Sequence, residues 1–465
     1  MSVIAGFMVP HPPLIIPEVG RGEERKIGET VAAYHQAARE IAGLKPETIV
    51  VISPHNVLYS DYFHIRPGNT LCGDFGHFRA GQVTIKADCD TEFVEALVKE
   101  GEREGLPWGT EGGREKRLDH GTMIPLYFVN QYETNYRLVS VGLSGLPLSL
   151  HYRLGQAIER TAKRLGRRTV VVASGDLSHY LTKDGPYGFH KEGPEYDRAI
   201  MEVMEYARFG QLLEFPDHFC SRAGECGHRS FTIMAGALDR KQVRAKRLSY
   251  QGPFGVGYGI CTYEVTGEAP DRDFLDQYMA NKRAHSRARR ETEDPYMALA
   301  RNALECYVNT GRPLPVPREL PREMLSEQAG AFVSIHKEGE LRGCIGTIAP
   351  CHESIAREII ENAVSAGTRD PRFHPVTAEE LPYLEYSVDI LGKPEKISSP
   401  EELDVKKYGV IVTKGRKRGL LLPDLDGVDN PVQQVMIARD KAGIRPDEQD
   451  VTLERFQVIR HGEKS

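Results

Sequence analysis

Three histidines share one placement in this chain: each follows the end of an apolar, β-branched segment. The segments at 2–8, 48–53 and 168–174 lead to His11, His55 and His179, respectively. Ligands of open α/β sheets bind outside the carboxyl ends of the strands. A single histidine in such a place is more often a turn residue, but three with the same placement favour a functional site. If these strands are neighbours, the three imidazoles converge on one crevice.

Two neutral imidazoles and one anionic ligand form a divalent-metal site with open positions. The third ligand is expected in "SRAGECGHRSFTIMAGAL" (221–238), where Glu225 and Cys226 open a helix of small residues. Glu225 would complete the two-histidine, one-carboxylate set typical of non-haem Fe(II). Cys226 would make a softer site that also suits zinc or copper. His228 is a third candidate, and Glu225 at a helix start could instead favour the helix dipole alone.

A second polar pair, Asp119-His120, precedes the apolar segment "GTMIPLYF". His120 has two interpretations of equal weight: a residue of the same pocket, or the first residue of a helix. Asp176 could cap the turn after the third strand. Prolines at 10, 12, 13 and 54 stiffen the loops that carry His11 and His55.

The elements that must position these residues alternate along the chain. A further strand is predicted at 137–143 and a closing strand at 255–265, with helical segments at 22–43, 92–104, 149–165 and 194–208. Segments such as "TIVVIS" and "TVVVAS" are apolar on both faces, as in interior strands covered by helices on each side. Residues 1–266 are therefore predicted to form an α/β domain with a mixed, largely parallel sheet flanked by helices.

The chain changes character after this region. Residues 267–293 are dense in charge and are predicted to be a linker, partly helical. Residues 294–465 are predicted to form an α+β domain, with helical segments at its start and at 352–365 and 430–443. Its segment "YGVIVTKGRKRGLLLP" is interpreted as two strands joined by a turn.

Composition narrows the classes of function. A net charge of -6 and a pI near 6.3 argue against broad nucleic-acid binding. The eight cysteines form no C-x-x-C pair, as expected of reduced thiols in a cytoplasmic protein. No apolar run approaches the roughly 20 residues needed to cross a bilayer, so no membrane association is expected.

The ordered motifs "VPHPP", "SPH", "LDHG", "SGDLSH" and "ECGHRSFTIMAGAL" resemble the LigB-like class III extradiol dioxygenases and the related Memo family. The resemblance implies metal-binding roles for His11 and His55, an acid–base role for His179 and a pocket-lining role for His120. "CGHRS" is similar to the Memo-type "CGRHP", which would place Cys226 in the metal position. Glu225 would instead restore the dioxygenase triad, so Cys226 and Glu225 both remain candidates for the third metal ligand.

The second half resembles the AMMECR domain through "LRGCIGT" (341–347), "GTRDPRFHPVT" and "EYSVDIL". Together the halves resemble protein A of the AmmeMemoRadiSam system, which implies a radical-SAM protein as partner.

These resemblances imply a non-haem Fe(II)-dependent, dioxygenase-like oxidoreductase that uses O₂ and a catechol-type or related aromatic substrate. The alternatives are a Memo-like, non-catalytic metal-binding scaffold and a zinc-dependent hydrolase at the same site. Self-association is left open.

Overall fold

The computed structural model describes residues 2–113, 117–337, 340–378, 380–425 and 427–462. The chain divides into two compact units, Met1–Met279 and Ala280–Ser465. Within the described residues, no helix combines the length and the apolar character needed to cross a membrane.

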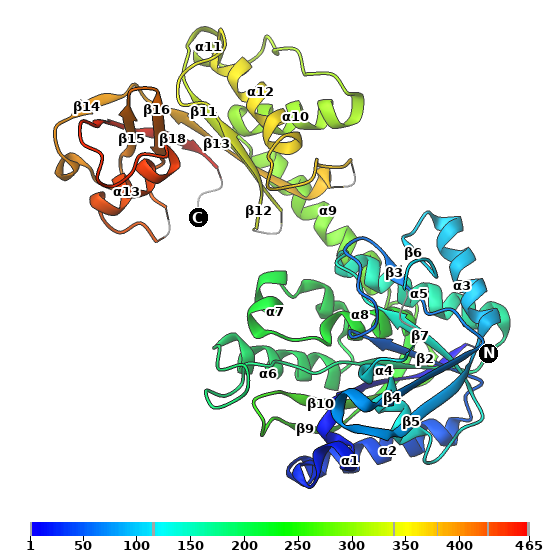
Figure 1. Cartoon of the computed structure of the whole chain (residues 1–465). Coiled ribbons are helices and arrows are strands. Elements are labelled where there is room, and N and C mark those ends of the chain that lie inside the picture. Colours follow the sequence, from blue (N-terminus) through cyan, green and yellow to red (C-terminus); the bar gives the residue numbers. More distant parts are fainter. Residues whose placement is uncertain (1, 114–116, 338–339, 379, 426, 463–465) are drawn as a thin grey trace. The chain divides into compact units, whose positions relative to one another are not determined.

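The first unit is built on one eight-stranded sheet (Figure 1). Its strands are β1 (Val3–Val9), β2 (Thr48–Ser53), β4 (Thr70–Phe75), β5 (Ala80–Cys89), β7 (Arg137–Gly142), β8 (Thr169–Ser174), β9 (Lys241–Gln251) and β10 (Tyr258–Glu268). They are ordered β4-β5-β7-β2-β8-β1-β10-β9. The four central strands β7, β2, β8 and β1 are mutually parallel, and β10 runs antiparallel to β1. A small pair, β3 (Phe63–His64) and β6 (Trp108–Gly109), lies outside this sheet.

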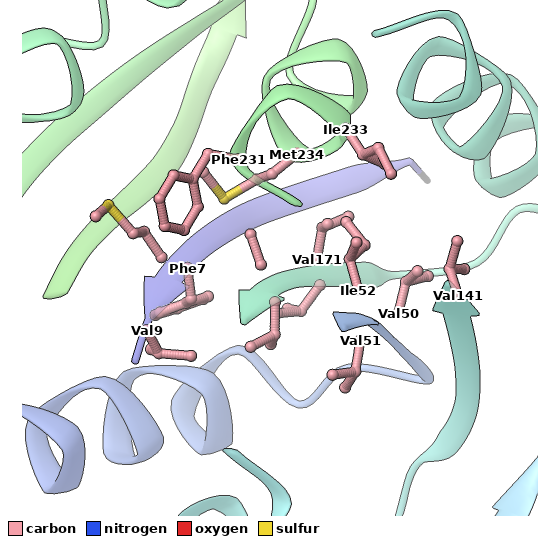
Figure 2. Packing of buried hydrophobic residues seen from close by; sticks show 14 of the residues in the cluster. Phe7, Val9, Val50, Val51, Ile52, Val141, Val171, Phe231, Ile233 and Met234 are labelled. Carbon is pink, nitrogen blue, oxygen red and sulfur yellow. The ribbon is translucent and has the colours of Figure 1, made fainter. Parts of the chain in front are cut away.

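Helices cover both faces of the sheet because the central strands are apolar on both sides: every residue of β2 and β8 is buried. The helices are α1 (Pro17–Gly20), α2 (Gly28–Leu44), α3 (Thr91–Glu104), α4 (His120–Val129), α5 (Leu148–Leu165), α6 (Glu192–Glu205), α7 (Asp217–Ala223) and α8 (His228–Ala237). One face contacts α5 and α8, and the other contacts α2 and α4. Figure 2 shows Phe231 and Met234 of α8 packed over β1.

The predicted fold class of this region, a mixed and largely parallel sheet between helices, is confirmed. The sequence pattern missed β4, β5 and β9. In β5 and β9 most side chains are partly or fully exposed, so these strands lack the apolar run that marks an interior strand. The apolar segment after Asp119 forms the helix α4.

A helix, α9 (Phe274–Thr292), occupies most of the charged segment predicted as a linker. Beyond it the second unit contains α10 (Pro295–Thr310), α11 (Arg322–Ser326), α12 (Ile355–Thr368) and α13 (Pro431–Lys441). One four-stranded sheet joins β12 (Glu340–Gly346), β11 (Ala331–Lys337), β13 (Leu384–Leu391) and β18 (Val458–His461) in that order. A second joins β14 (Glu395–Ile397), β17 (Thr452–Phe456), β15 (Gly409–Lys414) and β16 (Lys417–Leu421).

The predicted α+β character of this half is confirmed: both sheets are antiparallel and lie beside helices. The expected pair of strands is β15 and β16, joined by a turn at Gly415 and Arg416, and the rest of "KGRKRG" (414–419) belongs to the two strands. Separate apolar clusters serve the two sheets, one around Leu304, Val333 and Ile359 and another around Val410, Val412 and Val435. A third, smaller cluster around Leu391, Ile411 and Phe456 contains residues of both sheets, and the sequence pattern did not separate these clusters.

Candidate metal centre

The carboxyl ends of three neighbouring strands meet at one level of the central sheet. Val9 of β1 pairs with Ser174 of β8, and Ile52 of β2 pairs with Ala173 of β8, all in parallel register. Because these strands are adjacent and level, the residues that follow them must emerge side by side. The condition for the predicted convergence is therefore met.

Three potential ligand atoms come together at this edge. The Nε2 atoms of His11 and His55 lie 3.0 Å apart, and the Sγ atom of Cys226 lies 3.5 Å from His11 Nε2. All three ligand atoms lie within 4.8 Å of one another. Within the parts of the chain that the structure describes, this is the one group of three such residues close enough to share a metal ion.

The donor set fits a tetrahedrally coordinated transition metal. Metal–nitrogen bonds of about 2.1 Å and metal–sulfur bonds of about 2.3 Å would separate N from N by about 3.4 Å and N from S by about 3.6 Å. The observed 3.0 Å and 3.5 Å are close to these values. His11 Nδ1 lies 2.9 Å from Ser174 Oγ, so the other ring nitrogen is left to face His55 and Cys226.

The local electrostatics keep both imidazoles in the neutral, metal-binding form. Burial, with the neighbouring histidines adding to it, lowers the pKa of His11 well below its usual value. Desolvation also lowers the pKa of His55, with Asp119 opposing, although the His55 side chain remains open to solvent. Burial, followed by the charges of Asp176 and Glu225, raises the pKa of the Cys226 thiol well above its usual value. A bound cation reverses this effect, because a coordinating thiol is deprotonated.

Asp176 ties the loop of His11 to the loop of Cys226. Its Oδ1 accepts a hydrogen bond of 2.7 Å from the His11 backbone N–H, and its own N–H donates to Cys226 Sγ over 3.3 Å. Its carbonyl oxygen accepts from the N–H groups of Cys226 and Gly227. A Cβ atom on Gly175 would lie 2.1 Å from the Cα of Gly227, so this close approach requires glycine.

Glu225 is not a member of this three-residue group. Its Oε2 accepts a hydrogen bond of 2.6 Å from the N–H of His228, at the start of α8. Burial raises the Glu225 pKa to about 7, with the hydrogen bond from His228 opposing. The imidazole of His228 is also engaged elsewhere: Nε2 lies 2.8 Å from the Leu212 carbonyl and Nδ1 lies 3.1 Å from the Tyr196 hydroxyl. In this structure Cys226 is therefore the member of this segment that joins the two histidines.

His120 fits both interpretations of its sequence position, as a residue near the other histidines and as the first residue of a helix. It is the first residue of α4, whose start is capped by Asp119, and its ring centroid lies 4.1 Å from that of His55. Burial, and then the nearby His55, lowers its pKa to about 4. Asp119 also accepts a hydrogen bond of 2.5 Å from Ser53 Oγ, which in turn accepts from the His55 backbone N–H. This chain of bonds links His120 to the loop that carries His55.

His179 lies outside the three-residue group but near it. Burial lowers its pKa, and the charge of His55 acts in the same direction. Its ring stacks on that of Tyr187, with centroids 5.3 Å apart. The Phe78 ring lies edge-to-face against His120, with centroids also 5.3 Å apart. Neither aromatic residue was predicted from the sequence, because Tyr187 is exposed in a loop and Phe78 ends a single short helical turn, and such positions carry no periodic signal.

Comparison with known proteins places the two halves in families. The model described as the catalytic LigB subunit of aromatic ring-opening dioxygenase matches residues 5–261, and the AMMECR1 model matches residues 297–461. A protein of Clostridium acetobutylicum is 39% identical over 471 residues and covers 100% of both chains. A protein of Thermotoga maritima is 48% identical over 170 residues, which is 36% of this chain and 98% of its own.

Among solved structures, an uncharacterized protein of Pyrococcus horikoshii has 32% identity over 36% of this chain and 88% of its own, with a TM-score of 0.32. An uncharacterized Escherichia coli protein has 14% identity over 56% of this chain and 99% of its own, with a TM-score of 0.39. The family assignment rests on the sequence matches. The match to the LigB model by itself covers more than half of the chain. This chain therefore belongs to the LigB family of aromatic ring-opening dioxygenase subunits, and an AMMECR1 domain follows its LigB domain.

Proposed function

We propose that the LigB domain is a metal-dependent oxidoreductase of the dioxygenase type, acting on a small catechol-like or related aromatic molecule with O₂. The observation that carries this proposal is the convergence of the ligand atoms of His11, His55 and Cys226 within 4.8 Å at the carboxyl edge of the sheet. A metal held there would leave positions open for substrate on the side of His55, which is exposed.

The bound metal would supply Lewis acidity: it lowers the pKa of an oxygen ligand and brings reactants together. The residues of the chain would supply proton transfer. The pKa of His179 and of His120 is lowered, so both rings are neutral near pH 7 and can accept a proton. General acid–base catalysis by a positioned histidine typically contributes about 10² to 10⁴-fold. In this proposal His179 takes the substrate proton and His120 lines the pocket beside His55.

The identity of the metal distinguishes this proposal from its main alternative, a metal-binding scaffold without turnover. Fe(II) is the metal expected of a dioxygenase, whereas a thiolate ligand favours softer metals and oxidises readily near O₂. The position of Cys226, rather than Glu225, beside the histidines therefore supports a second candidate, a metal-binding scaffold without turnover. A zinc-dependent hydrolase with the same metal site is the third candidate function.

The deciding experiment is metal analysis of the full chain after anaerobic purification, with O₂ uptake measured on catechol after loading with Fe(II). We expect Cys226→Ala to lower metal affinity about 100-fold, a loss typical of removing a metal ligand or its support, while Glu225→Gln stays within tenfold of wild type. Cys72→Ala, at an exposed cysteine, is the matched control.

Each result has a separate meaning. Iron in the purified protein, together with O₂ uptake that His179→Ala abolishes without losing metal, supports the dioxygenase. Bound metal with no O₂ uptake supports the scaffold. Hydrolytic activity that is indifferent to O₂ supports the hydrolase. Metal retained in Cys226→Ala but lost in Glu225→Gln contradicts the ligand set.

We also propose a radical-SAM protein as the functional partner. The resemblance of the two-domain chain to protein A of the AmmeMemoRadiSam system supports this partner. Anaerobic co-purification of the two proteins tests it, and failure to associate under reducing conditions counts against it.

A further inference from the structure

A cavity of about 380 Å³ lies in the first domain, between α6, the short 3₁₀ helix η4 (Phe209–Glu214) and the start of α7. It shares no residue with the candidate metal centre. Its volume falls within the roughly 300 to 1,000 Å³ that is typical of small-molecule sites. More than half of its lining side chains are apolar, and these are Ala199, Val203, Phe215, Pro216 and Phe219. The cavity can therefore hold a ligand with a single ring.

Two phenylalanine rings form a wall of this cavity that is fixed on its buried side. The rings of Phe215 and Phe219 have centroids 6.2 Å apart, and each side chain is only partly buried. Phe215 contacts the ring of His228 with centroids 4.9 Å apart, and both phenylalanines contact Tyr196. Tyr196 and His228 are buried, and the Tyr196 hydroxyl lies 3.1 Å from His228 Nδ1. A ligand would therefore meet a preformed aromatic wall, which lowers the entropic cost of binding.

The charged groups of the cavity are net negative. Glu202 and Glu214 supply two carboxylates, and Arg208 supplies one guanidinium. The Arg208 guanidinium pairs with Glu202 over 3.1 Å and also lies over the Tyr206 ring. Among the residues that the structure describes, the Glu214 carboxylate has no hydrogen-bond or ion-pair partner. The cavity therefore combines an unpaired carboxylate with aromatic rings, and this combination attracts organic cations.

We propose that this cavity binds a small organic cation, a molecule in which one apolar or aromatic ring carries an ammonium group. The ring would pack on Phe215 and Phe219, and the ammonium group would pair with Glu214. Carboxylates and the faces of aromatic rings both attract an ammonium group. An anionic ligand would be repelled by Glu214, and a neutral ligand would take water from this carboxylate without replacing its hydrogen bonds. The composition of the cavity therefore selects for a cation and not only for an apolar molecule.

The test is calorimetric titration of the full chain with phenethylamine, which is protonated at neutral pH, and with phenethyl alcohol, its neutral counterpart. We expect the amine to bind about tenfold more tightly than the alcohol, because an exposed ion pair and a cation–π contact are each worth about threefold. Glu214→Gln should weaken amine binding about threefold and leave alcohol binding unchanged. Phe219→Leu, which keeps an apolar side chain without the ring, should weaken amine binding by about the same factor.

Matched controls lie outside the cavity. Glu195→Gln removes an exposed carboxylate from α6, and Phe189→Leu replaces an exposed phenylalanine. Neither residue lines the cavity, so both variants should bind the amine and the alcohol as the wild type does. Circular dichroism of each variant verifies that the domain remains folded, and unchanged metal content verifies that the metal centre is intact.

Four results would overturn the proposal. Equal affinity for the amine and the alcohol would mean that the cavity does not select for a cation. Absence of saturable binding at millimolar amine would mean that the cavity is a gap in the packing. Amine binding that persists in Glu214→Gln but is lost in Cys226→Ala would place the amine at the metal centre. Self-association of the full chain in sedimentation, abolished by Phe219→Leu, would identify this face as an interface between copies.

Discussion

The substitution Asp197→Asn should stabilise the first domain much more at pH 8 than at pH 4.5. Asp197 lies in α6 and is 2% exposed. Its two oxygens accept hydrogen bonds of 2.8 Å from the Ser178 N–H and 2.7 Å from the Tyr250 hydroxyl. Burial raises its pKa from 3.8 to about 7, and the two hydrogen bonds oppose the shift without cancelling it. The native state therefore resists ionisation of this carboxyl group.

The sign of the effect follows from proton binding. Between about pH 4 and pH 7 the native state holds a proton on Asp197 that the unfolded chain has lost, so wild-type stability falls as pH rises through this window. The difference of about three pH units corresponds to at most about 4 kcal/mol at pH 8. Asparagine cannot ionise, it still accepts from the Ser178 N–H, and the Tyr250 hydroxyl can rotate to accept from the new amide. The stability of the variant should therefore not fall between about pH 4 and pH 7 through this group.

The single tryptophan of the chain, Trp108, is buried in the first domain, so its fluorescence reports the unfolding of that domain. Urea unfolding should show a gain of about 1 kcal/mol for Asp197→Asn at pH 4.5, where the unfolded chain has already lost most of this proton, and of up to about 4 kcal/mol at pH 8. Glu195→Gln, at an exposed carboxylate of the same helix, should show no such gain. A variant less stable than wild type at pH 8 would refute the reasoning, because it would mean that the ionised carboxylate stabilises the native state.

Three further predictions concern the metal centre. Gly175→Ala should lower metal affinity at least about tenfold with little change in far-ultraviolet circular dichroism. The reason is that the added Cβ atom would lie 2.1 Å from the Cα of Gly227 and push the Cys226 loop away. Unchanged metal affinity would contradict the packing argument. Tyr187→Ala should raise the KM for an aromatic substrate several-fold and leave metal content unchanged, since it removes the ring stacked on His179; an unchanged KM would remove Tyr187 from the site. Chelation should lower the stability of the first domain by about 2.7 kcal/mol when the free metal had been at 100 times its Kd, and an unfolding midpoint indifferent to chelator would argue against a bound metal.

Much of the first domain can be predicted from sequence because its signals are local. The β-branched runs before His11, His55 and His179 mark interior strands, and their apolar character on both faces predicts helices on each side. The strand-end placement of the histidines follows from the same runs. The exposed strands β5 and β9 have no such pattern, since partners in the sheet rather than their own side chains decide their conformation.

The sequence by itself determined the residue types available to the site and the strand ends that present them. The tertiary structure decided which of them meet. Glu225 and Cys226 are adjacent in sequence, but the turn before α8 directs the carboxylate to the N–H of His228 and the thiol to His11. This choice depends on the close contact between the β8 end and that turn, and on Asp176, which joins loops 165 residues apart. Contacts over such separations leave no local pattern, and therefore only the folded chain reveals them.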